Sequence, residues 1–339
     1  MPPDFSDPRW FPVNYLPASD EFRMMTLDID TIGSASFLDR RMPAGPGEGV
    51  LVSAESAGSF RSSTPPAFLF HSAFCGSTLL ARALHAPPDA VSLKEPSVLL
   101  NLSSASLAEQ PGAVERLNKR LAAATTLLAR PWAPAGRVLI KPTNQANRLL
   151  SRMLQVQPES RAILLYSTLE EFLVSCFKKL PLAESRVRWM AQHLLVGSDL
   201  AERLGIPPLH AFSLPESCVF TWYAQLERYA RALESDVAGN LRTLDLQTLL
   251  REPVAAVGAA ARWLQLPHAL EAMDQKVAHI FGHDSKATQR LYGSTQRAAE
   301  NQLVTAQYGE VIARTLQWAS TSIEPYAVLP QTWKPLSLH

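Results

Sequence analysis

Beyond residue 66, short and almost wholly apolar runs alternate with longer stretches in which apolar residues recur every three or four positions. The apolar runs predict strands over 67–71, 90–94, 137–141, 161–167 and 241–246. The periodic stretches predict helices over 77–85, 109–129, 144–156, 169–179, 186–204, 214–237, 253–264 and 297–319. Strands that are apolar on both faces need cover on both faces. We therefore predict an α/β fold, a three-layer, doubly wound parallel sheet flanked by helices.

The first part of the chain has a different pattern. Residues 1–64 are rich in Pro, Gly, Ser and Asp, and their apolar stretches, over 22–29 and 49–52, are short. The run Ser62-Ser-Thr-Pro-Pro66 is typical of a linker, because these residue types favour turns and loops. We predict a small N-terminal extension over 1–64, irregular or β-containing, and one α/β domain over 65–339.

Composition narrows the classes of function. Lys and Arg number 32 against 31 Asp and Glu, a net charge of +1. So small a net charge gives no long-range attraction for nucleic acid or a membrane surface, and we expect neither as a partner. The three cysteines, Cys75, Cys176 and Cys218, have neither zinc spacing nor a disulfide framework, which favours a reducing compartment. The sequence begins without an apolar signal core, so we expect a cytoplasmic protein.

The strongest chemical signal lies where the first predicted strand passes into its helix. The run Phe68-Leu-Phe-His71 is followed by small residues and then by Gly76-Ser-Thr78 at the expected start of the helix. Such a turn directs backbone N–H groups and the positive end of the helix dipole at one point, where a phosphate binds well. The segment lacks the Gly-Lys-Ser/Thr ending of a Walker A loop. The candidate phosphate ligands are Ser72, Phe74, Cys75, Gly76, Ser77 and Thr78.

Further polar residues follow strands that end at the same edge of the predicted sheet. Lys94 and Glu95 end the second strand, and Lys141 ends the third. A carboxylate at this edge can act as a general base, and a lysine there can bind an anion. His71, beside the loop, is a second candidate base. The candidate catalytic residues are therefore Glu95, Lys94 and His71, with Lys141 as an anion ligand.

Two serines extend the candidate site along the fourth strand and its helix. Ser167 ends that strand, and Ser175 lies two turns into the helix, so both can face one pocket. His279 and His283 are four residues apart, as in zinc-binding helices, but no third ligand is evident and we expect no metal.

Three segments resemble, in this order, the PAPS-dependent sulfotransferases, where PAPS is 3′-phosphoadenosine 5′-phosphosulfate. Gly76-Ser-Thr-Leu-Leu80 resembles that family's 5′-phosphosulfate loop, 166–175 its 3′-phosphate motif, and 244–266 its late Tyr-Glu-Asp-Leu stretch. The resemblance spans about residues 67–320 and is to divergent bacterial members. It implies a P-loop-type sulfotransferase fold, PAPS as co-substrate, and Ser175 with Ser167 as ligands of the 3′-phosphate. The stretch His283-Asp-Ser-Lys286 resembles a late polar loop of some bacterial members, which implies Lys286 as a further phosphate ligand.

Two departures from the family pattern remove positive charge. Phe74 stands where the family's loop carries Arg or Lys, beside Cys75 in place of its first Ser. Ser167 stands where the 3′-phosphate motif carries Arg, and a hydroxyl is a poor substitute for a guanidinium fork. The residues that can supply the missing charge from elsewhere are Lys94, Lys141, Arg186 and Arg188.

We therefore expect an enzyme that transfers a sulfonate group from PAPS to a hydroxyl or amine of a small-molecule or peptide acceptor. In this scheme Glu95 removes the proton of the acceptor. Two alternatives stay open. One is a nucleotide-dependent phosphoryl-transfer enzyme, which needs Mg²⁺ and an acidic ligand near the loop. The other is a degenerate, non-catalytic member of the fold that binds a nucleotide or a partner, and the two missing cations favour it.

Overall fold

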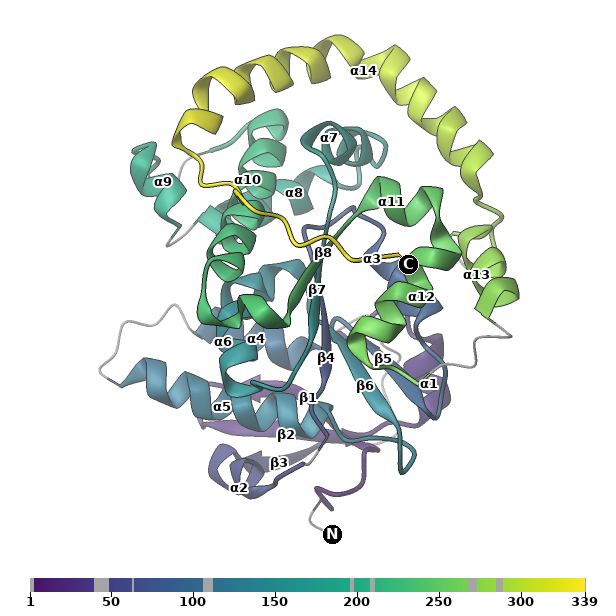
Figure 1. Cartoon of the computed structure of the whole chain (residues 1–339). Coiled ribbons are helices and arrows are strands. Elements are labelled where there is room, and N and C mark those ends of the chain that lie inside the picture. The colour runs from purple at the N-terminus through teal and green to yellow at the C-terminus, as the bar shows by residue number, and fades with distance from the viewer. Residues whose placement is uncertain are drawn as a thin grey trace.

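A five-stranded parallel sheet forms the centre of the computed structural model, which describes residues 3–39, 49–62, 64–105, 112–195, 198–207, 211–267, 273–284 and 289–338 (Figure 1). In spatial order its strands are β5 (Ala90–Lys94), β6 (Arg137–Lys141), β4 (Ala67–His71), β7 (Ala162–Tyr166) and β8 (Leu241–Asp245). Each pairs in parallel with its neighbours. Within this sheet the chain passes first through the central β4, then through β5 and β6 on one side, and then through β7 and β8 on the other. The predicted α/β fold with a doubly wound parallel sheet is confirmed.

Helices cover both faces of this sheet (Figure 1). On one face pack α4 (Ser97–Ala105), α5 (Ala113–Leu128), α6 (Leu150–Val156), α7 (Leu169–Phe177), α8 (Glu184–Leu195) and α10 (Leu214–Leu233). On the other face pack α3 (Ser77–Ala83), α11 (Leu246–Arg251), α12 (Pro253–Leu264) and α13 (Met273–Phe281). Such a sheet places the carboxyl ends of its strands, and the loops that follow them, at one edge, where α/β proteins bind ligands.

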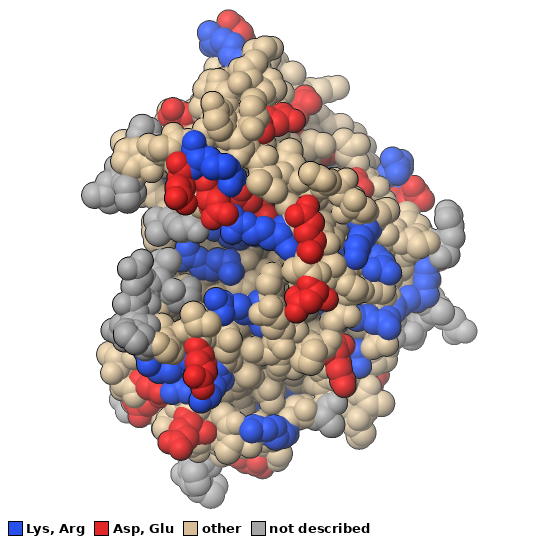
Figure 2. All heavy atoms as spheres, turned by 60° about the vertical axis from the view of Figure 1, so that its left-hand side comes forward, with Lys and Arg blue, Asp and Glu red and all other residues tan. Residues whose placement is uncertain are grey.

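The outer surface carries both signs of charge. Acidic and basic side chains are interspersed over the face in Figure 2, as the net charge of +1 leads one to expect. The most exposed large apolar side chains are those of Leu182, Leu303 and Leu291. Within the described ranges, no helix has the length and apolar character needed to cross a membrane.

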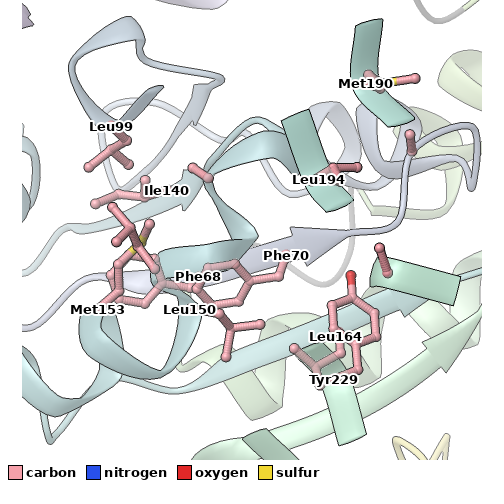
Figure 3. Close-up of a cluster of buried hydrophobic side chains, with 14 of the residues drawn as sticks. Phe68, Phe70, Leu99, Ile140, Leu150, Met153, Leu164, Met190, Leu194 and Tyr229 are labelled. Carbon is pink, nitrogen blue, oxygen red and sulfur yellow. The ribbon is translucent and has the colours of Figure 1, made fainter. Parts of the chain in front are cut away.

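The core has two layers, because successive side chains of a strand point to opposite faces of the sheet. Phe68 and Phe70 of β4 point into the larger cluster, whereas Ala67 and Leu69 point into the smaller one. Figure 3 shows part of the larger cluster, in which the strand residues Phe68, Phe70, Ile140 and Leu164 meet Leu99, Leu150, Met153, Leu194 and Tyr229. Each large apolar side chain buried in this way stabilises the fold by about 1.5–3 kcal/mol.

The N-terminal segment forms a second, antiparallel sheet. Its strands are β1 (Trp10–Leu16), β2 (Glu21–Thr26) and β3 (Val50–Ser53), with α1 (Ile29–Ser34) and α2 (Ala54–Ser59) between and after them. Phe22 and Met24 of β2 are fully buried and join the larger core cluster. The buried Arg130, just after α5, donates hydrogen bonds to the carbonyl oxygens of Phe5 (3.1 Å) and Asp7 (2.7 Å).

Several predicted elements need correction. The helix expected over 186–204 is two helices, α8 and α9 (Asp199–Arg203), because Ser198 is extended and its Oγ accepts a hydrogen bond from the N–H of Ala201. The stretch 144–156 begins as a 3-10 helix, η1 (Asn144–Leu149), before α6. The last long helix, α14 (Ser294–Ser322), is longer than expected, and α4 and α13 were not predicted at all. Two further 3-10 turns, η2 (Asp236–Asn240) and η4 (Glu324–Tyr326), complete the described elements.

Candidate functional site

The loop between β4 and α3 has a strained backbone. Ala73, Phe74 and Gly76 all have left-handed φ angles, of 73°, 51° and 80°. For the two residues with side chains this conformation costs about 1–3 kcal/mol each, and such strain gathers at ligand sites, where the surrounding structure holds it in place. Gly76 is the N-cap of α3 and has no side chain to cap it. The first N–H groups of the helix therefore stay available to a ligand.

Two of the loop's side chains lie beneath it rather than in a cavity. Ser72 and Cys75 are fully buried. The Cys75 thiol donates to the carbonyl oxygen of Leu165 at 3.5 Å, and burial raises the pKa of Cys75 to about 11. Cys75 is therefore a neutral packing residue, and any contribution to anion binding comes from its backbone. The side chains of Phe74, Ser77 and Thr78 do line a cavity.

Two cavities adjoin at this loop. The first, of about 470 Å³, is lined by the loop, by His71 and Glu95, and by the segment from Lys178 to Met190. The second, of about 940 Å³, is lined by the side of α7, the start of α11 and described residues between His283 and Thr305. The two cavities share four lining residues, Phe74, Gly76, Lys178 and Lys179. A molecule that passes the loop can therefore occupy both.

A buried cluster of titratable groups adjoins the first cavity, and two of its members, His71 and Glu95, line that cavity. The Lys141 ammonium donates to Glu95 Oε1 at 2.7 Å, and His71 Nε2 lies 3.8 Å from the same oxygen. All three side chains are at most 8% exposed. Because His71 Nδ1 accepts a hydrogen bond from the N–H of Ala73 at 3.2 Å, the neutral ring carries its proton on Nε2. Glu95, rather than His71, is thus the group that can accept a proton here.

The structure does not bring Lys94 into either cavity. Lys94 and Glu95 are neighbours in sequence, but the Lys94 ammonium donates to the carbonyl oxygen of Gly33 at 2.9 Å, among residues of α1. Burial, together with the charges of Arg82 and Lys141, lowers the pKa of Lys94 to about 8. We leave Lys94 out of the site and keep Glu95, Lys141 and His71.

Two lysines that the sequence analysis did not identify bring positive charge to the loop. Lys178 and Lys179, at the end of α7, line both cavities, and the Lys179 ammonium lies 4.2 Å from the centre of the Phe74 ring. A cation therefore sits beside the loop position at which the sulfotransferase pattern carries Arg or Lys, although another element supplies it. The signal was present, because residues three and four positions after Ser175 share its helix face.

The other cations named from the sequence have separate places. Lys141 is paired with Glu95, and Arg188 is paired with Glu184 at 2.6 Å. Arg186 lines the first cavity. Lys286 lies outside the described residues.

The second cavity collects polar groups from α7 and α14. Ser175 lines it, together with Arg290 and Arg297, which sequence reasoning also missed. The Lys178 ammonium donates to the Tyr292 hydroxyl at 3.3 Å, and that hydroxyl donates to Glu300 at 2.6 Å. Desolvation by burial lowers the pKa of Lys178.

Ser167, by contrast, does not line either cavity. It is fully buried, and its Oγ has no hydrogen-bond partner in the described part of the chain. Its carbonyl oxygen accepts a hydrogen bond from the Trp222 indole at 2.8 Å. Of the two serines assigned to one pocket, only Ser175 faces a cavity.

The two spaced histidines form no larger cluster. The rings of His279 and His283 stack with their centres 4.4 Å apart, and His283 Nδ1 lies 2.7 Å from the carbonyl oxygen of His279. Over the ranges that the structure describes, no three His, Cys, Asp or Glu side chains form a group that could hold a metal ion.

Comparison with known proteins returns sulfotransferases among solved structures. Sulfotransferase STF9 from Mycobacterium avium is 13% identical, over 76% of this chain and 79% of that chain, with a TM-score of 0.41. A sulfotransferase from Alicyclobacillus acidocaldarius is 15% identical, over 78% and 99%, with a TM-score of 0.37. A mouse sulfotransferase solved with PAP is 10% identical, over 81% and 99%, with a TM-score of 0.37. No protein-family model and no curated protein sequence matches the chain.

Proposed function

We propose that this protein is a sulfotransferase, which transfers a sulfonate group from PAPS to a hydroxyl or amine of an acceptor. The observation that carries the proposal is the strained loop of residues 73–76, which separates two cavities of different chemistry. The buried carboxylate of Glu95 lines one cavity, and the other is lined, among the described residues, by Ser175 and by four cations interspersed with four carboxylates. Group transfer at the loop requires that a donor bind on one side of it and an acceptor on the other.

The donor nucleotide is assigned to the second cavity, whose volume of about 940 Å³ is within the usual range for ligand sites. Ser175 and Arg297 line it and are suited to the 3′-phosphate, because a guanidinium and a hydroxyl are strong phosphate donors. The loop N–H groups and the ammonium groups of Lys178 and Lys179 would face the 5′-phosphosulfate. These lysines replace the charge that Phe74 and Ser167 do not supply.

The acceptor is assigned to the first cavity, beside Glu95. Glu95 takes the proton of the acceptor as the acceptor oxygen or nitrogen bonds to sulfur. The bond between sulfur and the bridging phosphate oxygen breaks, and PAP leaves with that electron pair. Lys141 holds the carboxylate in place through the 2.7 Å contact. Lys178, Lys179 and the loop N–H groups stabilise the negative charge on the transferring group, as preorganised donors do.

Titration calorimetry with PAP in the absence of metal tests the proposal. We expect a single site, and ligand at about 100 times its dissociation constant should stabilise the fold by about 2.7 kcal/mol. Arg297→Ala should weaken PAP binding about tenfold or more, because it removes a charged phosphate donor. Arg314→Ala is the matched control, since Arg314 lies on the same helix but is exposed and paired with Glu310 at 3.7 Å.

Binding of ATP with Mg²⁺ but not of PAP would replace the sulfotransferase by the phosphoryl-transfer alternative. Tight PAP binding without transfer to any acceptor would identify the degenerate, non-catalytic alternative. A PAP affinity that is equally reduced in Arg297→Ala and Arg314→Ala would remove the second cavity from the donor site.

A further inference from the structure

The positive side chains around the two cavities fall into three groups. Arg290 and Arg297 line only the second cavity, and Lys178 and Lys179 line both. Arg186 lines only the first cavity, the one assigned to the acceptor. Other cations are therefore available to the donor, and Arg186 lines the space that the acceptor would occupy.

Arg186 also differs from its neighbour on α8. Arg188, two residues further on, is neutralised by the Glu184 carboxylate at 2.6 Å. Arg186 has no carboxylate partner among the residues described. Among the described residues that line the first cavity, the only carboxylate is that of Glu95, and Lys141 already pairs with it. The described lining of this cavity therefore carries a net positive charge. Of its cations, Arg186 is the one most distant from the loop in sequence.

The wall that carries Arg186 is otherwise apolar. Leu180, Leu182 and Met190 line the first cavity on this side, and Phe37 lines it from the N-terminal part of the chain. Leu182 is 90% exposed, although its neighbours Ala183 and Val187 are buried. An apolar body placed between Phe37 and Met190 would bury this surface.

We infer that the acceptor is an amphipathic molecule, with an apolar body that carries the reacting hydroxyl or amine at one end and an anionic group at the other. The anionic group pairs with Arg186, and the apolar body packs on Phe37 and Met190. The reacting group then lies beside Glu95. The inference rests on the proposed function and adds the chemical class of the acceptor to it.

The test compares three phenols of one shape: 4-propylphenol, 3-(4-hydroxyphenyl)propanoate and 4-(3-aminopropyl)phenol. Each is titrated by calorimetry into protein saturated with PAP, so that no turnover is needed. We expect the carboxylate to bind about tenfold more tightly than the neutral phenol, since an added charge-assisted pair is worth about that factor. The amine should bind most weakly.

Arg186→Leu should abolish the preference for the carboxylate and change the affinity of the neutral phenol by less than about twofold. Arg188→Leu removes the same charge two residues away and should leave the preference intact. Arg186→Lys should keep part of it, because a lysine keeps the charge but not the planar fork.

Each of the following outcomes overturns the inference. If PAP does not bind, the proposed function fails and the inference fails with it. If PAP binds but the complex binds none of the phenols, or binds all three equally, the inference alone is wrong. If Arg186→Leu weakens PAP binding as much as it weakens binding of the carboxylate, Arg186 is a donor ligand. If Arg188→Leu removes the preference equally, the effect is one of net charge.

Discussion

Glu95 stands out at the scale of single residues because its backbone and its side chain are both constrained. Its φ of 58° is left-handed, which costs about 1–3 kcal/mol for a residue with a side chain. Its N–H donates to the carbonyl oxygen of Lys141 at 2.7 Å, and its Oε1 accepts from the Lys141 ammonium at the same distance. The two contacts hold the carboxylate at the first cavity, where the proposed transfer needs a general base.

Glu95→Gln should lower turnover by about 10²–10⁴-fold and leave PAP affinity unchanged, because it removes the base and keeps the shape. The same change leaves the buried Lys141 ammonium without its carboxylate, so we expect a loss of about 3 kcal/mol in the free energy of unfolding. Steady-state kinetics and urea denaturation measure the two effects.

Lys141→Met in the Glu95→Gln background should recover part of that stability but none of the turnover. Full activity of Glu95→Gln would remove Glu95 from the mechanism. Strictly additive losses of stability would show that the Glu95–Lys141 pair is not coupled.

Gly76 is the second residue with a constrained backbone conformation. Its φ of 80° favours glycine, and a Cβ there would lie 3.0 Å from Leu246 Cδ1. Gly76→Ala should lower the free energy of unfolding by about 1–2 kcal/mol and weaken PAP binding, because the loop backbone must shift. Gly205→Ala is the matched control: its φ is 62°, and nothing lies within 4 Å of its Cβ position.

Both variants should lose stability in urea denaturation, and only Gly76→Ala should lose PAP affinity in calorimetry. PAP affinity that is unchanged in Gly76→Ala would mean that the loop is structural only.

At the scale of elements, two positive side chains, those of Lys94 and Lys276, and the His85 imidazole join α1, α3 and α13 beside β5. The Lys94 ammonium reaches Gly33 at the end of α1, and the Lys276 ammonium of α13 donates to the carbonyl oxygen of His85, just after α3. The N–H of Ser92 donates to His85 Nδ1 at 3.1 Å. Burial, followed by the charges of Lys94 and Lys276, lowers the pKa of His85 to about 4. The junction therefore needs a neutral His85.

We predict that this junction weakens the fold in acid. An unfolded histidine has a pKa of about 6.5, so between that pH and about 4 the unfolded state binds more protons at position 85 than the folded state. The contribution of His85 to the free energy of unfolding is complete above pH 6.5. It should fall by up to about 1.4 kcal/mol per pH unit as the pH drops toward 4.

Urea denaturation at pH 4.5, 5.5 and 6.5 measures this dependence. His85→Asn keeps an acceptor for the N–H of Ser92 and should flatten the curve, whereas His193→Asn, at an exposed position of α8, should not. Identical pH dependence in His85→Asn and the parent would contradict the assignment.

At the scale of the whole molecule, the N-terminal sheet and the central sheet are held by one core cluster. Phe22, Ile32 and Leu38 are fully buried in the cluster that also contains Phe68 and Phe70. The N–H of Leu38 donates to the carbonyl oxygen of Lys94 at the end of β5. The N-terminal part also contributes Phe37 to the lining of the first cavity.

A chain that starts at residue 65 should therefore not fold cooperatively. It loses several large buried side chains, each worth about 1.5–3 kcal/mol, from a total stability that is usually about 5–15 kcal/mol. Near-ultraviolet circular dichroism and size-exclusion chromatography measure the outcome, with a chain that starts at residue 3 as the control. A sharp thermal transition with an unchanged midpoint in the shorter chain would show that residues 65–339 fold alone.

The sequence by itself determined the central strands and the loop. The predicted bounds of β4, β5 and β6 agree with the structure residue for residue, because a strand buried on both faces is a continuous apolar run with polar residues at its ends. The turn into α3 was recognisable because it depends on glycine and small residues that are adjacent in the chain. Glu95 was likewise found by its place directly after a strand.

Only the tertiary structure decided which side chains meet. Lys94 and Glu95 point to different surroundings although they are adjacent, because Glu95 lies beyond the end of β5 and its left-handed φ of 58° turns the chain there. Lys178 and Lys179 reach the loop from the end of α7, and Arg297 reaches the second cavity from α14. Such contacts join positions far apart in sequence, and helix packing sets them rather than any local pattern. Local residue order thus specifies strands, turns and single candidate groups, whereas packing alone assembles them into a site.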